Sequence, residues 1–174
     1  MIDLLVLFSI LKKELTMYGI QKSISDAFSA YTMPSFGAIK PSLKRLESQG
    51  FIVTRKTMSD GGKQSCFYSI KPEGLKELKK LLLEDMSKNP LQFFSNARIK
   101  LSCASFLSKD EAAELFSQLK MKAADHKYNA EKTLENEYIS LTFYQRIVLD
   151  NSVCEYQNLI SLIENLEKEN ARNS

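Results

Sequence analysis

Apolar residues recur every three or four positions along the first thirty residues, which is the spacing of helices with one buried face. Residues 2–13 are mostly apolar and finish with two lysines, so we predict a buried first helix over this range. Thr16 stands where it can cap a second helix. The apolar face of that second helix comprises Ile20, Ile24 and Phe28.

A third helix is predicted after Ser35, its N-cap residue, and it ends just before Gly50. Its apolar stripe comprises Ile39, Leu43 and Leu46. Lys40 and Lys44 repeat the same spacing on a different, polar face. Pro41 would be the sixth residue of this helix, where it removes one backbone hydrogen bond. We therefore expect a bend, or a short loosened lead-in before the proline.

The hydrophobic pattern then changes from helical spacing to alternation. Residues 51–58 and 64–70 are rich in β-branched and aromatic residues, and the SDGGK segment between them supplies turn residues. This combination predicts a β-hairpin. Pro72 can lie in the first turn of a fourth helix. The predicted core face of that helix comprises Leu75, Leu78 and Leu82.

The second half of the chain predicts three more helices. Asn89 and the proline after it suit the start of the first. Its predicted stripe comprises Phe94, Ala97, Leu101 and Ala104. Ser108 and Glu111 match a capping box at the start of a long helix that runs to roughly residue 137. A last long helix covers roughly residues 143–168.

The last helix carries apolar residues at coiled-coil spacing. The stripe comprises Leu149, Val153, Tyr156, Ile160 and Ile163, broadened by Leu159, Leu162 and Leu166. Each of the two long helices would be about 40 Å long, at 1.5 Å per residue. Helices of this length and apolar character need a partner surface. A second copy of the chain is the economical partner, so the stripe is our candidate dimerisation surface.

Positive charge gathers around the third helix and the hairpin. Residues 40–63 hold six Lys or Arg and two Asp or Glu, whereas the whole chain has a net charge of only +3. DNA binding needs cations on elements that fit the grooves, because the cations neutralise phosphates. A solvated face on a module that binds protein would carry the same charges, so charge alone leaves both interpretations open.

The predicted order of helix, helix, basic helix, hairpin and helix is that of a winged helix-turn-helix domain. Three segments, MYGIQKSI, PSFGAIKPSLKRLESQGFI and GGKQSCFYSIKPEG, resemble the PadR family of bacterial transcriptional regulators. The resemblance is specific over residues 4–82. The second half resembles the longer PadR-like regulators in pattern and length.

The resemblance implies a mainly α fold with a winged helix-turn-helix domain at residues 1–86. It also implies an antiparallel helical region at residues 87–174 for dimerisation and effector sensing. The expected function is a bacterial, cytoplasmic regulator, a repressor, which binds a roughly palindromic operator in double-stranded DNA as a homodimer. A small aromatic effector would release it, and no cofactor, metal or membrane is expected.

This chain departs from the family pattern at three places. Lys40 stands where a tyrosine usually precedes the proline, so a salt-sensitive phosphate contact would replace a tyrosine contact. Ile20 and Gln21 replace a Tyr–Glu pair. Lys71 replaces the threonine before the fourth helix, and loss of that N-cap should cost about 1 kcal/mol of stability. Our candidate DNA-binding residues are Ser35, Lys40, Lys44, Arg55, Lys56 and Lys63.

Other chemistry has little support in the sequence. The three cysteines, Cys66, Cys103 and Cys154, lack metal-ligand spacing and suit a reduced compartment, so we interpret them as core residues rather than redox sensors. His126, the one histidine, falls on a helical seam with Leu119 and Ala123 and cannot form a metal site alone.

Aromatic side chains are frequent in the second half, where they suit either a helical core or a ligand pocket. They are Phe93, Phe94, Phe106, Phe116, Phe143 and Tyr144, and we favour the core. No catalytic constellation is present in the sequence, so an enzyme is the least favoured class. Two alternatives to the DNA-binding regulator stay open: a winged-helix module that docks protein, and a ligand-sensing helical dimer without strong DNA binding.

Overall fold

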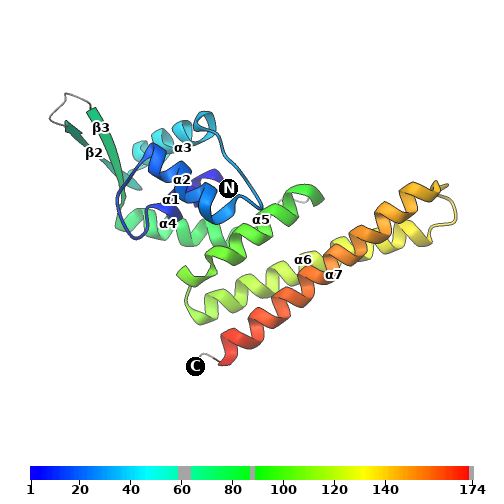
Figure 1. Cartoon of the computed structure of the whole chain (residues 1–174). Helices are drawn as coiled ribbons and strands as arrows, with labels where there is room; N and C mark the ends of the chain where they lie inside the picture. Colours follow the sequence, from blue (N-terminus) through cyan, green and yellow to red (C-terminus); the bar gives the residue numbers. More distant parts are fainter. Residues whose placement is uncertain (59–63, 87–88, 173–174) are drawn as a thin grey trace. The chain divides into compact units, whose positions relative to one another are not determined.

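The computed structural model describes residues 1–58, 64–86 and 89–172 of the chain. The chain divides into two compact units, Met1–Phe106 and Leu107–Ser174. The predicted boundary near residue 86 separates a DNA-binding region from a dimerisation region. Compactness does not test that division of function, so the boundary stays a prediction. Figure 1 shows that helices dominate both units and that the strands belong to the first.

The first unit follows the predicted order of helices and hairpin (Figure 1). Its elements are α1 (Ile2–Ser9), β1 (Leu15–Thr16), α2 (Met17–Phe28), α3 (Phe36–Ser48), β2 (Ile52–Met58), β3 (Gln64–Ile70), α4 (Pro72–Leu83), α5 (Pro90–Cys103) and a 3-10 turn, η1 (Ala104–Phe106). The mainly α fold class and the winged helix-turn-helix arrangement are thus confirmed.

The sheet has three antiparallel strands in the order β1-β3-β2. The β2–β3 hairpin was predicted, but β1 was not, and this explains an error in the first helix. α1 ends at Ser9 rather than near residue 13. The chain leaves the helix early because Leu15 must pair with Tyr68 of β3.

The core of the first unit surrounds α1, which packs against α2, α3 and α4. Four consecutive residues of α1, from Leu4 to Leu7, are buried, so this helix is covered on all sides. The predicted stripes of α2 and α3 are buried as expected. On α4, Leu78 and Leu82 are buried, but Leu75 is 37% exposed, so its assignment to the core face was wrong.

Local capping signals account for several helix starts. The hydroxyl of Thr16 accepts a hydrogen bond from the Gly19 amide at 3.1 Å. The side chain of Asn89 accepts from the two amides that follow Pro90. Lys71 provides no side-chain cap for α4, in line with the missing threonine. These ends show that short-range hydrogen bonds fix where the helices begin.

Gly50 ends α3 in the way that its position predicted. Its φ of +76° lies in the left-handed region, where a side chain is disfavoured. The amide of Gly50 donates to the carbonyl of Glu47, and the amide of Phe51 donates to that of Leu46. This pair of bonds is a Schellman motif, which turns the chain directly into β2.

The second unit is a hairpin of two long helices, α6 (Lys109–Glu135) and α7 (Phe143–Arg172), which pack along each other. Lys120 binds Glu167 across the pair, and the ring of His126 stacks on Tyr156 at 5.4 Å. These pairings run in opposite directions along the two helices, so the hairpin is antiparallel. Buried Leu119 and Ala123 confirm the predicted seam position of His126.

Both helices of this unit begin with reciprocal caps. The predicted capping box of Ser108 and Glu111 is present. A second one, which we did not predict, precedes α7. The amide of Thr142 donates to the side chain of Gln145 at 2.9 Å, and the amide of Gln145 donates to the Thr142 hydroxyl at 3.3 Å. Each helix start is therefore specified by residues within its own first turn.

Three predicted core side chains lie in other environments. Phe143 is 72% exposed and Tyr144 is 79% exposed, so the core interpretation was wrong for both. Cys154 is exposed rather than packed in apolar surroundings, whereas Cys103 is buried and Cys66 is half-buried. The sequence showed that these side chains are apolar or aromatic, but not which neighbours would cover them. Among the described residues, no helix combines the length and apolar character needed to cross a bilayer.

Candidate nucleic-acid interface

The third helix, α3, separates its apolar and basic residues as predicted. Its stripe residues are at most 2% exposed and face the core. Lys40, Pro41 and Lys44 are all exposed. Since Lys40 and Lys44 are four residues apart, they lie on one face of the helix. The result is a basic helix face held against the domain by the opposite, apolar face.

Pro41 lies inside a continuous helix. The element runs from Phe36 to Ser48 without a break, so the predicted lead-in is not a separate segment. The amides of Ala38 and Ile39 both donate to the carbonyl of Ser35 at 3.0 Å, which closes the first turn. The proline removes one hydrogen bond, to the carbonyl of Gly37. Burial of the apolar stripe keeps the helix intact despite that single loss.

Ser35 occupies the N-cap position of α3, but its side chain makes no capping hydrogen bond. The residue is exposed, and the first turn carries no acidic side chain. The amides at this end of the helix therefore lack a side-chain acceptor from the cap. A helix end of this kind favours an anion, because its free amides and its dipole both point outward.

The third cation of α3, Arg45, is engaged within the domain. Its guanidinium binds both carboxylate oxygens of Asp3 in α1, with 2.9 Å between Nε and Oδ2. The hydroxyl of buried Ser42 donates to the same carboxylate at 2.5 Å. The bond to Asp3 raises the pKa of Arg45. This pair was not predicted, although an aspartate in an otherwise apolar helix was a signal for it.

Arg55 and Lys56 of the wing differ in whether another side chain already binds them. Arg55 of β2 binds Glu14 through two hydrogen bonds, and its guanidinium lies 5.1 Å from the centre of the Phe67 ring. The bond to Arg55 lowers the pKa of Glu14, and the same bond raises the pKa of Arg55. Lys56 is exposed, and in the part of the chain that the structure describes it forms no ion pair.

Neighbouring residues of a strand point to opposite faces, so Arg55 and Lys56 cannot present their side chains to one surface. Arg55 faces the side of the sheet where Glu14 and Phe67 lie. The predicted wing site therefore separates into a paired cation and an exposed one. The remaining wing candidate, Lys63, lies outside the described residues.

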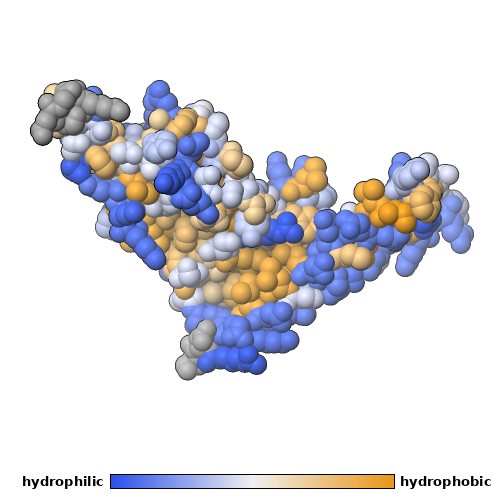
Figure 2. Space-filling model, in the orientation of Figure 1, coloured by the Kyte–Doolittle hydropathy of each residue, from blue (hydrophilic) through white to orange (hydrophobic). Residues whose placement is uncertain are grey.

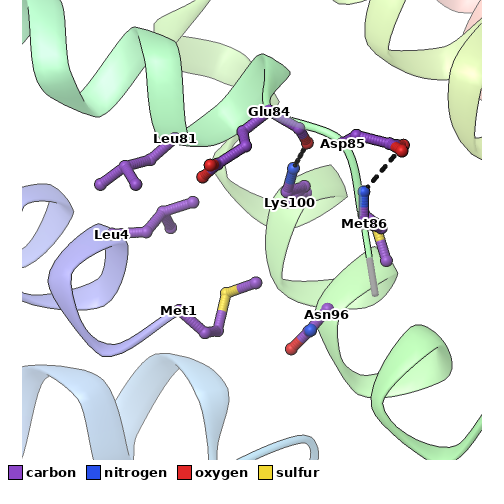
Figure 3. Close-up of a pocket in the computed structure, with 8 residues that line it drawn as sticks. All are labelled: Met1, Leu4, Leu81, Glu84, Asp85, Met86, Asn96 and Lys100. Atoms are coloured by element: carbon purple, nitrogen blue, oxygen red, sulfur yellow. Dashed lines mark hydrogen bonds between the residues drawn. The ribbon is translucent and has the colours of Figure 1, made fainter. Parts of the chain in front are cut away.

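The first unit also holds a cavity of about 120 Å³ beside the ends of α1, α4 and α5 (Figure 3). Its lining comprises Met1, Leu4, Leu81, Glu84, Asp85, Met86, Asn96 and Lys100. Lys100 is only 3% exposed, and its Nζ donates to the carbonyl of Glu84. The ammonium group thus caps the end of α4. A lysine in a helical pattern gave no sign of this burial.

The predicted dimerisation stripe is partly used within one chain. Tyr156 is 5% exposed and Ile163 is fully buried in a single copy, and Tyr156 packs its ring against His126. The other stripe residues, Leu149, Val153 and Ile160, are half-buried. The apolar residues of α7 therefore serve the α6–α7 hairpin first and leave a narrower surface for any partner.

An exposed apolar patch lies at the start of α7, and we call it the tip patch. Figure 2 shows apolar residues gathered at this end of the second unit. The patch comprises Tyr138, Ile139, Phe143, Tyr144, Ile147 and Val148, all at least 41% exposed. Phe143 and Tyr144 pack edge to face at 5.6 Å. Of these residues, only Phe143 and Tyr144 had been considered from the sequence, as core or ligand-pocket residues.

Metal chemistry finds no support in the described ranges. No group of three or more His, Cys, Asp or Glu side chains is placed there to hold an ion. Burial raises the pKa of the Cys103 thiol to about 12, which removes its thiolate character. Burial also lowers the pKa of His126, so this histidine favours its neutral form.

Several solved structures are similar to this chain over nearly its whole length. Bacillus subtilis PadR in complex with operator DNA is 23% identical, with 97% of this chain and 98% of that chain covered and a TM-score of 0.45. The same protein with p-coumaric acid is 21% identical over 98% of each chain, with a TM-score of 0.43. A PadR-like regulator from Bacillus cereus is 20% identical over the full length of both chains, with a TM-score of 0.43.

A search of curated proteins gives no match. The model of the transcriptional regulator PadR-like family matches residues 6–80, which span the segment from α1 into α4 and include the whole basic helix and hairpin. Residues 6–80 of this chain are therefore similar to the PadR-like family of transcriptional regulators.

Proposed function

We propose that the protein is a sequence-specific DNA-binding repressor that acts as a homodimer on a roughly palindromic operator. One observation carries the proposal. Within residues 6–80, which match a family of transcriptional regulators, α3 exposes Lys40 and Lys44 on the face opposite its buried stripe. An α-helix fits the major groove, and two cations on one face can neutralise phosphates along its edge.

Each candidate residue has a distinct proposed role. Lys40 and Lys44 bind phosphates beside the base edges that α3 reads. Ser35 and the amides of the first turn bind another phosphate, since that helix end lacks a side-chain cap. Lys56 and Lys63 contact the backbone from the wing. Arg55 contributes less, because Glu14 already neutralises it.

The second unit supplies the proposed dimer. Leu149, Val153 and Ile160 keep partial exposure on α7, and the tip patch adds aromatic surface at one end of that helix. A two-fold dimer would hold two α3 helices about 34 Å apart, one turn of DNA. Regulation by a small aromatic effector belongs to the same proposal. A thermal shift of the purified protein with aromatic acids would test it.

The decisive experiment selects bound sequences from a random DNA pool with the purified full-length protein. We expect an enriched palindrome with half-sites one helical turn apart. A single enriched half-site would contradict the dimer, and no enrichment would contradict sequence-specific binding. DNA affinity that is weak and insensitive to salt would favour the protein-docking module in its place.

Point variants then test the helix assignment. Lys40→Ala and Lys44→Ala should each reduce the slope of log affinity against log salt by about one unit. Lys168→Ala, an exposed lysine on α7, is the matched control and should leave the slope unchanged. An unchanged slope in the Lys40→Ala/Lys44→Ala double variant would show that α3 does not face DNA.

A further inference from the structure

The turn between α2 and α3 is tied to α5 by two contacts that join residues far apart in the sequence. The Ser95 hydroxyl of α5 donates to the carbonyl of Tyr31 at 2.8 Å. The guanidinium of Arg98, one helical turn further along α5, lies 6.0 Å from the centre of the Tyr31 ring. The same guanidinium lies 5.6 Å from the ring of Phe94. Arg98 therefore contacts Tyr31 on the loop and Phe94 on its own helix.

Tyr31 lies between the end of α2 and the start of α3. It stands four residues before Ser35, the N-cap residue of α3. Its amide donates to the carbonyl of Phe28 at 2.8 Å, which fixes it to the end of α2. The ring of Phe28 packs edge to face on Phe8 of α1 at 6.2 Å. Tyr31 thus joins the core on one side and α5 on the other.

The start of α3 has little else to fix it locally. Its N-cap side chain makes no capping bond, and Gly37 and Pro41 both lie within its first two turns. Pro41 provides no amide for the carbonyl of Gly37. Buried Ile39 holds one side of this helix end against the core, and the preceding turn is the other element that can set the direction in which the end points.

We propose that Ser95 and Arg98 are positioning residues for DNA binding: by holding Tyr31, they set the orientation of the α3 start. This inference rests on the proposed function. The two residues touch no DNA in this scheme, and they act through the turn. α5 is also the last long helix of the first unit, and the chain continues from it through η1 into the second unit. A change in α5 would thus reach the DNA-reading helix through Tyr31.

The test compares Ser95→Ala and Arg98→Gln with Ser102→Ala. Ser102 is the matched control, since it lies on α5 and its hydroxyl donates to the Arg98 carbonyl of its own helix. For the Ser95→Ala/Arg98→Gln double variant, affinity for the selected operator should fall about tenfold, as expected for loss of one hydrogen bond and one cation–π contact. Affinity for a random duplex and the salt slope should stay unchanged, because no phosphate contact is lost.

Two outcomes would overturn the proposal. If operator and random duplex weaken together and the salt slope falls by about one unit, Arg98 binds phosphate directly. If operator affinity equals that of the Ser102→Ala control, the turn does not depend on α5.

A measurement without DNA separates this inference from the proposed function. Hydrogen exchange of the amides at residues 32–38 should accelerate in the double variant and not in Ser102→Ala. If exchange is faster in the double variant but the protein selects no DNA sequence, the proposed function is refuted and the role of the α5 contact stands. Unchanged exchange would refute the contact's role whatever the DNA result.

Discussion

Gly74 packs so closely against the carbonyl of Phe51 that a side chain at position 74 would overlap it. A Cβ atom there would also lie 2.8 Å from Cγ1 of Ile70. The start of α4 thus rests directly on the base of the hairpin. We predict that Gly74→Ala lowers the free energy of unfolding by about 1–3 kcal/mol, as overpacking of a core does, measured by urea denaturation.

Gly37 provides the control for this prediction. A Cβ atom at position 37 would meet only the Ser35 hydroxyl, at an ordinary distance of 3.4 Å. Gly37→Ala should therefore be neutral or should stabilise α3 by up to about 1 kcal/mol, because alanine is the better helix former. Equal destabilisation by both substitutions would contradict the packing argument for Gly74.

The second prediction concerns the carboxylate of Asp3. Asp3→Ala removes the acceptor of the buried Ser42 hydroxyl as well as the partner of Arg45. We expect a loss of about 1–3 kcal/mol in unfolding free energy, mostly from the unpaired buried hydroxyl, since half-exposed ion pairs contribute little. Asp26→Ala, at an exposed position of α2, should change stability by less than about 0.5 kcal/mol.

The third prediction concerns Glu14 and depends on DNA binding. Glu14→Gln removes a negative charge beside the wing and releases Arg55 from its ion pair. Affinity for DNA should rise, and the salt slope should steepen by up to about one unit. Glu155→Gln on α7 controls for the change in net charge alone. A rise of equal size in both variants would show that Arg55 stays away from phosphates.

The fourth prediction concerns pH and His126. Burial lowers the pKa of this histidine below its ordinary value of 6.5, so the unfolded chain binds its proton at a higher pH than the folded chain does. Stability from His126 is therefore complete above pH 6.5 and falls as pH decreases toward the folded pKa. In His126→Gln, this part of the acid dependence should be absent from urea unfolding curves. An equal change in unfolding free energy between pH 8 and pH 5 in the two proteins would contradict this prediction.

The fifth prediction distinguishes the cysteines. A thiol reagent at neutral pH should label exposed Cys154 first, whereas Cys103, buried and with a pKa of about 12, should react only after unfolding. Cys154→Ser should abolish the fast phase of labelling. Rapid labelling of Cys103 in the folded protein would show that α5 opens readily.

Interactions within one or two helical turns were predictable from the sequence. The cap at Thr16, the box at Ser108 and the stop at Gly50 involve groups at most five residues apart, and each is present. The buried stripes of α2 and α3 follow from helical spacing alone. The hairpin followed from alternation and turn residues. Local chemistry therefore determined the element order and the family resemblance.

Interactions between distant residues were not predictable. Asp3 and Arg45 are 42 residues apart, and Ser95 and Tyr31 are 64 apart, so no local pattern connects them. β1 is only two residues long and exists because β3 pairs with it. The exposure of Phe143 and Tyr144 likewise depends on how α6 and α7 pack. For the DNA-binding candidates, the sequence identified cations but not that Arg55 is already paired.

The reciprocal caps of α6 and α7 have a consequence for the order of folding. Starting a helix is its most costly step, because several residues must be fixed before the first hydrogen bond forms. Ser108 with Glu111, and Thr142 with Gln145, lower that cost at the start of each helix. We infer that both helices can start to form as the chain emerges during synthesis, before the His126–Tyr156 contact closes the hairpin. The second unit would then fold without waiting for a second chain.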